Sequence, residues 1–291
     1  MAGRVNVGKS TLANNIIGSK IVITSRKAQS TRNRINCIYN DKNSQMILTD
    51  IPGFLKPKNL LTEKLNGLIL STLKESDIIL AVVDVYEGIG KGDYFVFENL
   101  KNQNKPVILA LNKIDMVNAS RLKEEKEKLK EFDFFKEIIS ISALEGKNIK
   151  LLIRLIKRYL PEGPAYFPDD ILSDRPLRNI VEDIIREKLI SKLNEELPHS
   201  VNVEIERFED RTTNLKEKIT SISANIFVQK KSHKSIIIGK QGSFLKECGQ
   251  KARLEIEELI GNKVFLELWV KVRENWTKDE NALRDFGYGN N

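Results

Sequence analysis

The sequence predicts an α/β protein of two domains, in which a mostly parallel sheet with helices on both faces is followed by a smaller α+β domain. The chain has 291 residues, too many for one ordinary hydrophobic core and enough for two. Up to residue 160, short apolar runs alternate with segments of helical periodicity, as in βαβ units. A proline-rich segment then precedes a new order of elements. We therefore expect a first domain over 1–160, a linker over 161–176 and a second domain over 177–291.

The expected elements follow from hydrophobic periodicity and from the residues that end each segment. In the first domain, the run 78–83 is almost continuously apolar, as is typical of a strand buried on both faces. The first domain is expected to contain helix 9–17, strands 35–39 and 45–49, helix 60–73, strand 78–83, helix 95–100, strand 107–111, helix 121–132, strand 137–141 and helix 149–159. The second is expected to contain helix 177–193, strands 201–208 and 219–229, two helices on either side of 239–242, and strand 263–272.

Composition narrows the class of protein. Hydrophobic residues make up 41% of the chain, and no run of about twenty apolar residues predicts a membrane span. No basic and then apolar leader begins the chain, so we expect a protein of the cytoplasm. We also expect a monomer. Cys37 and Cys248 lie in unrelated contexts, which predicts buried thiols instead of a disulfide or a zinc site. The net charge of +8 indicates a nucleic-acid partner only if the positive charge is concentrated locally.

The segment 3–10 fits the phosphate-binding pattern G-x-x-x-x-G-K-[ST]. Its glycines allow backbone N–H groups to approach phosphates, and the next helix adds the positive end of its dipole. Lys9 would reach the β- and γ-phosphates, and the Ser10 hydroxyl would hold Mg²⁺. A glycine turn before a helix is the alternative. The loop residues expected to bind nucleotide are Gly3, Arg4, Val5, Asn6, Val7, Gly8, Lys9 and Ser10.

Only Met1 and Ala2 precede this loop, whereas a phosphate-binding loop usually follows a strand. Two residues span about 7 Å, which is too short for a strand. The first strand is therefore expected to be missing. We expect either that the natural chain begins further upstream or that the sheet lacks a central strand.

Two segments further along would sense the γ-phosphate. Thr31 ends a polar segment over 25–32 and is the candidate for a second Mg²⁺ ligand, although a threonine before an edge strand is often only a turn residue. The strand after it ends in D-x-x-G, where Asp50 would hold Mg²⁺ through a water and the Gly53 N–H would contact the γ-phosphate. An ordinary Asp-x-Pro-Gly turn is the alternative. The residues of this motif are Asp50, Ile51, Pro52 and Gly53.

The motif N-K-x-D follows the strand 107–111 and would select the base. The Asp115 carboxylate can accept hydrogen bonds from N1–H and the exocyclic amine of guanine, and adenine offers neither donor. All of these motifs lie at strand ends in the order of a P-loop GTPase, so the first domain is predicted to bind GTP and GDP. The base-binding residues are expected to be Asn112, Lys113, Ile114 and Asp115, with the backbone of Ser142, Ala143 and Leu144.

Phe54 follows the D-x-x-G motif, where many GTPases have a glutamine that orients the attacking water. A phenylalanine cannot hydrogen-bond that water, so we expect slow intrinsic turnover that depends on a monovalent cation or a bound partner. Asn6 could supply an oxygen to K⁺, or could brace the turn through its side chain. The residues expected to take part in catalysis are Lys9, Thr31, Asp50 and Gly53.

The second domain carries a G-x-x-G turn between two expected helices, which is typical of the nucleic-acid clamp of a KH domain. The order helix, strand, strand, helix, helix, strand matches the type 2 arrangement. A bare G-x-x-G is common, and a charge run is usually a solvated face, but 230–253 holds seven basic residues and one acidic residue. We therefore predict RNA binding here, and core packing for Trp276. The expected RNA-binding residues are Ile238, Gly239, Lys240, Gln241, Gly242, Lys246, Lys251 and Arg253.

Together these motifs resemble the Era family of bacterial ribosome-assembly GTPases over nearly the whole chain. The segments 26–32, 237–242 and 282–288 are especially similar to that family. The resemblance implies GTP hydrolysis, binding to the 3′ end of 16S ribosomal RNA and to the 30S subunit, and peripheral association with the inner face of the cell membrane. It also implies a hydrophobic residue at the position of Phe54.

Two other functions are weighed against this one. The first is a non-catalytic RNA-binding KH protein whose truncated GTPase domain is impaired. The second is a tRNA-modification GTPase of the same superfamily, which is disfavoured because such proteins embed the GTPase in helices and lack a KH domain.

Overall fold

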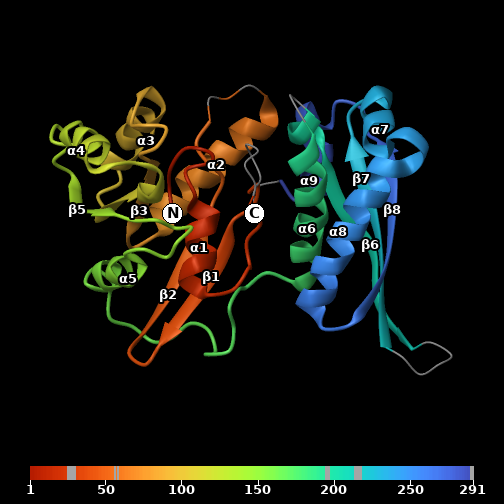
Figure 1. The fold of residues 1–291 in the computed structure, drawn as a ribbon, viewed down its shortest axis with the longest axis horizontal. Coiled ribbons are helices and arrows are strands. Elements are labelled where there is room, and N and C mark those ends of the chain that lie inside the picture. The colour runs from red at the N-terminus through yellow and green to blue at the C-terminus, as the bar shows by residue number, and fades with distance from the viewer. Residues whose placement is uncertain (25–30, 56, 58, 194–196, 213–217, 289–291) are drawn as a thin grey trace. The chain divides into compact units, whose positions relative to one another are not determined.

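The computed structural model divides the chain into two compact units, one formed mainly by residues up to Asp174 and the other by residues from Arg175 onward. Figure 1 shows the elements of each unit. The structure describes residues 1–24, 31–55, 57, 59–193, 197–212 and 218–288. Most of the resemblance segment 26–32 lies outside these residues. The predicted fold class, an α/β unit followed by an α+β unit, is confirmed.

The first unit contains a three-stranded parallel sheet and a separate antiparallel hairpin. The sheet has the order β3-β4-β5, and β1 pairs with β2. Every residue of β3 and β4 is buried, as their continuous apolar runs predict. The elements are α1 (Lys9–Ile17), β1 (Ile35–Asp41), β2 (Ser44–Asp50), α2 (Leu60–Glu75), β3 (Ile79–Asp84), α3 (Lys91–Lys101), β4 (Val107–Asn112), α4 (Ala119–Glu127), β5 (Phe135–Ser140) and α5 (Ile149–Lys157).

Helices cover both faces of this sheet. Successive residues of a strand point to opposite faces, so neighbouring residues of β4 belong to different clusters. Ile108 of β4 belongs to a cluster with Leu12 of α1 and Leu152 of α5. Its neighbour Leu109 belongs to a second cluster, with Ile69 of α2 and Phe97 of α3. The carboxyl ends of β3 and β4 therefore emerge between two helical layers, at the edge where the predicted motifs begin.

Ala2 contacts the sheet where a strand before the loop would lie. Its N–H donates to the Leu80 carbonyl at 2.8 Å, and its carbonyl accepts from the Val82 N–H at 2.8 Å. The Met1 amine donates to the Thr49 carbonyl of β2 at 2.7 Å. A cavity of about 1180 Å³ lies beside these contacts, lined by residues of β2 and β3 among others. Within the described part of the chain no strand precedes α1, so only a single bridge ties the start of the loop to β3.

The second unit is a three-stranded sheet of order β6-β7-β8, with β6 antiparallel and β8 parallel to β7. α6 and α8 pack together and contribute to its core. Trp276 is fully buried and donates from Nε1 to the Ser200 carbonyl at 3.0 Å, so its predicted core role is confirmed. The elements are α6 (Leu177–Lys192), β6 (Asn202–Thr212), β7 (Lys218–Val228), α7 (Lys231–Ile238), α8 (Ser243–Ile260), β8 (Lys263–Val272) and α9 (Glu280–Asp285).

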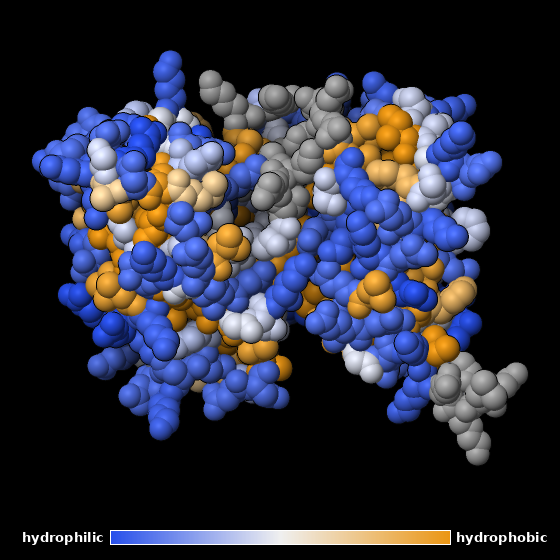
Figure 2. All heavy atoms as spheres, viewed as in Figure 1, coloured by the Kyte–Doolittle hydropathy of each residue, from blue (hydrophilic) through white to orange (hydrophobic). Residues whose placement is uncertain are grey.

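The surface of both units is mainly hydrophilic on the face drawn in Figure 2, where hydrophobic residues form separate patches. No helix in the described ranges combines the length and the apolar character that crossing a bilayer requires. Cys37 and Cys248 are buried thiols, as the sequence predicts.

A buried ion-pair group lies at the start of the second unit. Asp183 of α6 accepts hydrogen bonds from Arg175 and, at 3.0 Å, from Arg186. All three side chains are at most 13% exposed. Burial by itself raises the pKa of Asp183, but the Arg186 and Arg175 guanidinium groups outweigh it and hold the pKa below its usual value. The carboxylate therefore stabilises the folded unit in its charged form.

We expect Asp183→Asn to lower the free energy of unfolding by about 3–5 kcal/mol, because two guanidinium groups would remain buried without their carboxylate. Both tryptophans of the chain lie in the second unit, so tryptophan fluorescence in a denaturant titration measures its unfolding. Because the folded pKa is depressed, this stabilisation is present above the unfolded pKa of about 3.9 and is lost as the pH falls through the folded pKa.

The matched control for this prediction is Glu209→Gln, which breaks the exposed Arg211–Glu209 pair. It should change the free energy of unfolding by about 1 kcal/mol or less. Equal stability of Asp183→Asn and the wild-type chain at pH 7 would contradict the expected role of the buried carboxylate.

Candidate nucleotide-binding and RNA-binding sites

Three motif glycines lie where a side chain would collide with the backbone or with a side chain of another motif. A Cβ atom on Gly3 would lie 2.4 Å from the Val82 carbonyl oxygen. A Cβ on Gly8 would lie 2.3 Å from Asn112 Nδ2, and a Cβ on Gly53 would lie 2.5 Å from the Val5 nitrogen. Gly8 also has a φ of 97°, in the left-handed region that favours glycine. These glycines let the loop pack closely against β3, Asn112 and the D-x-x-G motif.

Asn112 joins three of the predicted motifs. Its Nδ2 donates to the Val7 carbonyl of the loop at 2.8 Å, and its Oδ1 accepts from the Ala143 N–H at 2.9 Å. The side chain is 2% exposed, so neither bond competes with bulk water. The loop, the N-K-x-D segment and the segment 142–144 therefore occupy one site.

The three oxygen-bearing side chains predicted near the metal are in mutual contact. Ser10 Oγ donates to Asp50 Oδ2 at 2.8 Å, and Thr31 Oγ1 lies 3.2 Å from both of these atoms. Asp50 is fully buried, and its Oδ1 has no hydrogen-bond partner among the described residues. Burial raises the pKa of Asp50, although Lys9 and the Ser10 hydroxyl oppose that rise. This set of hard oxygen donors, one of them buried and unpaired, fits Mg²⁺.

Within the described residues, no three His, Cys, Asp or Glu side chains cluster to form a metal site of their own. Mg²⁺ usually keeps waters and takes oxygens from substrate phosphates in addition to a few protein ligands. Ser10 and Thr31 would hold the ion directly and Asp50 through a water, and the ion would neutralise charge on the phosphates.

Lys9 is turned toward its own loop. Its Nζ donates to the Arg4 carbonyl at 2.9 Å, and the side chain is almost completely buried. Burial lowers the pKa of the Lys9 ammonium group to about 8, although the Asp50 carboxylate raises it. Phosphate oxygens would replace the Arg4 carbonyl as its partner.

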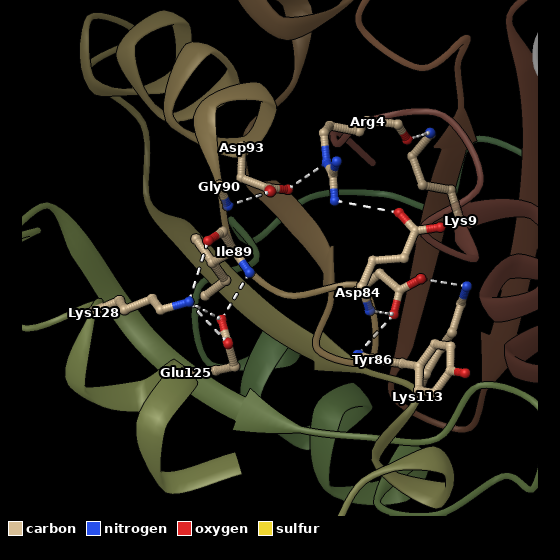
Figure 3. Close-up of polar contacts among 11 residues, drawn as sticks. Arg4, Lys9, Asp84, Tyr86, Ile89, Gly90, Asp93, Lys113, Glu125 and Lys128 are labelled. Atoms are coloured by element: carbon tan, nitrogen blue, oxygen red, sulfur yellow. Dashed lines mark hydrogen bonds and ion pairs between the residues drawn. The ribbon is translucent and has the colours of Figure 1, made fainter. Parts of the chain in front are cut away.

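The side chains of Arg4 and Phe54 contact α3 and the residues before it (Figure 3 shows the contacts of Arg4). Arg4 Nε donates to Asp93 Oδ1 at 2.9 Å, and its guanidinium lies 3.5 Å from Glu87. Phe54 is buried, with its ring 6.1 Å from that of Phe95 in an edge contact. Its N–H donates to the Gly3 carbonyl at 3.1 Å. Arg4 is thus ion-paired, and the Phe54 ring belongs to the α3 side of the core.

Asp84 is a residue of this site that the sequence analysis missed. It ends β3, is 1% exposed, and pairs with the Lys113 ammonium group (Figure 3). Its carboxylate also accepts hydrogen bonds from the N–H groups of Tyr86 at 2.9 Å and Glu87 at 3.2 Å. Lys113 has a φ of 68°, which is uncommon for a residue with a side chain. An acidic residue at the end of a fully apolar strand was the available signal, because the carboxyl ends of parallel strands share one edge.

Asp115 lies in a short 3-10 turn over Ile114–Met116 and is exposed, as is Leu144. The Asp115 carboxylate is therefore accessible to a base. Lys113, which precedes this turn, is held by Asp84.

We expect Asp84→Asn to lower the affinity for GDP about tenfold, because the amide keeps an acceptor for the Tyr86 N–H but loses the charge that holds Lys113. The measurement is calorimetric titration of the two single variants and of the double variant with Lys113→Ala. If Asp84 acts through Lys113, adding Asp84→Asn to Lys113→Ala should cost little further affinity. Fully additive losses would contradict this role, and the melting temperature serves as a control for folding.

The G-x-x-G turn begins where α7 ends and α8 starts. Gly239 has φ 72° and ψ 177°, and Gln241 and Gly242 also have positive φ. A Cβ on Gly239 would lie 2.7 Å from Phe244 Cβ, whereas nothing lies within 4 Å of a Cβ on Gly242. Gly239 is therefore required by packing, and Gly242 borders open space.

A groove of about 480 Å³ extends from this turn between α8 and β8. Lys246 and Arg253 line it, as the sequence predicts for basic residues on this helix. Lys251 does not line it and instead pairs with Glu247 at 3.1 Å, a residue that also binds Lys192. The groove is lined by Gly242, Leu245, Lys246, Gly249, Gln250, Arg253, Val264, Phe265, Leu266 and Leu268.

Two family models match the chain. One, described as a 50S ribosome-binding GTPase, covers residues 1–113, and the other, a KH domain, covers residues 196–277. The chain is 49% identical over 286 residues to a GTPase Era of Alkaliphilus oremlandii, covering 98% of the chain and 96% of that protein. It is 46% identical over 291 residues to a GTPase Era of Clostridioides difficile, covering 99% and 96%.

Two solved structures are similar over almost their whole length. One is Era in complex with MgGDPNP and nucleotides 1506–1542 of 16S ribosomal RNA, with a TM-score of 0.94, 40% identity, and coverage of 99% of this chain and 97% of that one. The other is a tyrosine-to-alanine variant of Aquifex aeolicus Era bound to GDP and AlF4⁻, with a TM-score of 0.94, 39% identity and the same coverage.

Proposed function

The chain belongs to the Era family of GTPases, and we propose that it is an RNA-coupled switch that binds the 3′ end of 16S ribosomal RNA and acts in assembly of the 30S subunit. The observation that carries this proposal is the pairing of two sites in one chain. The first unit holds the contact group of Ser10, Thr31 and Asp50 beside the phosphate loop. The second holds a basic groove at a G-x-x-G turn. The γ-phosphate would order the segments around Thr31 and Gly53. Hydrolysis removes that phosphate and would thereby release the bound ribosomal particle.

In the nucleotide site, the loop 3–10 would cradle the phosphates, with Lys9 on the β- and γ-phosphates. Ser10 and Thr31 would hold Mg²⁺, which lowers the repulsion between the phosphate oxygens. Asp115 would accept from guanine, with Lys113 fixed by Asp84 beside it. The Asn112 hydrogen bonds support this assignment, because they hold the phosphate and base segments in one arrangement.

Intrinsic turnover is proposed to be slow. The ring of Phe54 cannot orient a water, and Arg4, which is part of the loop itself, is paired with Asp93 and Glu87. A bound partner or a monovalent cation must then supply what the chain lacks. K⁺ held by the Asn6 side-chain oxygen is our candidate, and faster turnover in KCl than in NaCl would support it.

Peripheral contact with the inner face of the cell membrane, a cytoplasmic location and a monomeric state are also proposed. The membrane contact rests on the family resemblance alone. Co-flotation of the full chain with anionic vesicles, compared with neutral vesicles, tests the membrane contact.

We expect Asp115→Asn to lower GTP affinity by roughly 30- to 200-fold, because two charge-assisted hydrogen bonds to the base are weakened. Wild-type chain should bind ATP far more weakly than GTP. Calorimetric titration with both nucleotides measures this, and ATP binding as tight as GTP binding would refute a guanine site.

GTP turnover with and without ribosomal RNA distinguishes the switch from a non-catalytic RNA-binding protein. Lys9→Ala serves as the inactive control, since it removes the charge from the phosphates. RNA binding with no turnover above that control would favour the non-catalytic alternative.

For the RNA site, we expect Gly242→Asp to weaken RNA binding about tenfold or more, because it places a negative charge at a turn that would approach phosphates. Gly242→Asn is the matched control of similar size without the charge and should weaken binding less. Aspartate and asparagine both tolerate positive φ, and no neighbour of Gly242 obstructs the new side chain. Labelled-RNA anisotropy measures the affinity, and equal losses for the two variants would contradict a phosphate contact here.

A further inference from the structure

Two large aromatic side chains on β8 are exposed to solvent. Phe265 is 56% exposed and Trp269 is 57% exposed, whereas Val264 and Val270 of the same strand are buried. Because side chains of a strand alternate between its faces, Phe265 and Trp269 lie on the same outer face, about 13 Å apart. Single exposed apolar side chains are common, but two large rings on one face of a strand form an apolar patch, and such patches can mark a binding surface.

The neighbouring strand gives these rings no apolar cover. Across the sheet, Phe265 is opposite Ser221 and Trp269 is opposite Asn225. Beside these small polar residues both rings remain more than half exposed, so packing within the sheet does not account for two aromatic residues here. Exposed aromatic rings are suited to stacking on nucleic-acid bases.

The charge around the rings is compatible with an RNA strand. Lys263 and Lys271 are exposed at the two ends of the same face. The acidic residue between the rings, Glu267, accepts a hydrogen bond from Arg207 at 2.7 Å, so its charge is compensated.

The outer face is continuous with the groove, because Phe265 lines the groove and is also one of the exposed rings. A KH groove holds about four nucleotides. The RNA in the similar structure, nucleotides 1506–1542 of 16S ribosomal RNA, is far longer. Such an RNA needs a further surface on the protein or remains in solvent.

We propose that single-stranded RNA leaving the groove continues over the outer face of β8 and stacks its bases on Phe265 and Trp269. This inference rests on the proposed RNA-binding function. The stacking contact would be independent of the G-x-x-G turn. Because the rings contact base faces and not base edges, the surface would accept different RNA sequences.

Tryptophan fluorescence tests the proposal directly. The chain has two tryptophans, and Trp276 is fully buried, so Trp269 is the one that a ligand can reach. Titration of the full chain with nucleotides 1506–1542 of 16S ribosomal RNA should quench the emission. Trp269→Phe should bind this RNA with similar affinity but lose most of the quenching, since phenylalanine can still stack.

Affinity measurements provide the second test. Trp269→Ala and Phe265→Ala should each weaken RNA binding about tenfold, the effect typical of losing one stacked base. Leu259→Ala is the control, because Leu259 is 40% exposed on α8 and lies outside the groove lining. GTP affinity should be the same in all variants.

RNA binding with unchanged tryptophan emission and full affinity of Trp269→Ala would overturn the inference and would leave this face to a protein partner. Such a result would leave the proposed function intact. Complete absence of RNA binding by the wild-type chain would instead refute the proposed function, and the stacking surface with it.

Discussion

The nucleotide site depends on the two hydrogen bonds of Asn112. One buried amide bonds to the carbonyl of Val7 and to the N–H of Ala143, so it fixes the distance between the phosphate loop and the base segment. These backbone groups lie 105 and 31 residues from Asn112, in opposite directions along the chain. Leaving either the donor or the acceptor of this buried amide unpaired is expected to cost about 1–3 kcal/mol. Contacts within the chain therefore hold the two segments together, which reduces the ordering that a nucleotide must impose.

Close packing restricts three positions of this site to glycine. Gly8 faces the Asn112 side chain, Gly3 faces β3, and Gly53 faces the loop. The same contacts bring Phe54 and Arg4 against α3, where Asp93 holds Arg4. A shift of the D-x-x-G segment toward a γ-phosphate would therefore strain the packing of Phe54 against Phe95.

The sequence predicted the elements and the order of the motifs well, because both depend on local periodicity and on strand ends. It could not show which side chains join the motifs. Asp84 has no motif of its own, and its contact with Lys113 depends on the adjacent register of β3 and β4. Lys251 fits the basic pattern of its helix but pairs with Glu247, which also contacts Lys192 of α6.

The exposure of Trp269 shows the same limit of prediction from the sequence. Trp276 and Trp269 are seven residues apart, yet one is fully buried and the other is 57% exposed. Strand alternation assigns Trp269 to one face of β8, but only the sheet order shows that the strand beside it offers a polar residue, Asn225, and no apolar cover. The charge of the second unit is likewise organised by contacts: acidic residues such as Glu247 and Glu267 are paired with basic partners, while Lys246 and Arg253 line the groove. Local arrangement, more than net charge, therefore determines where a polyanion can bind.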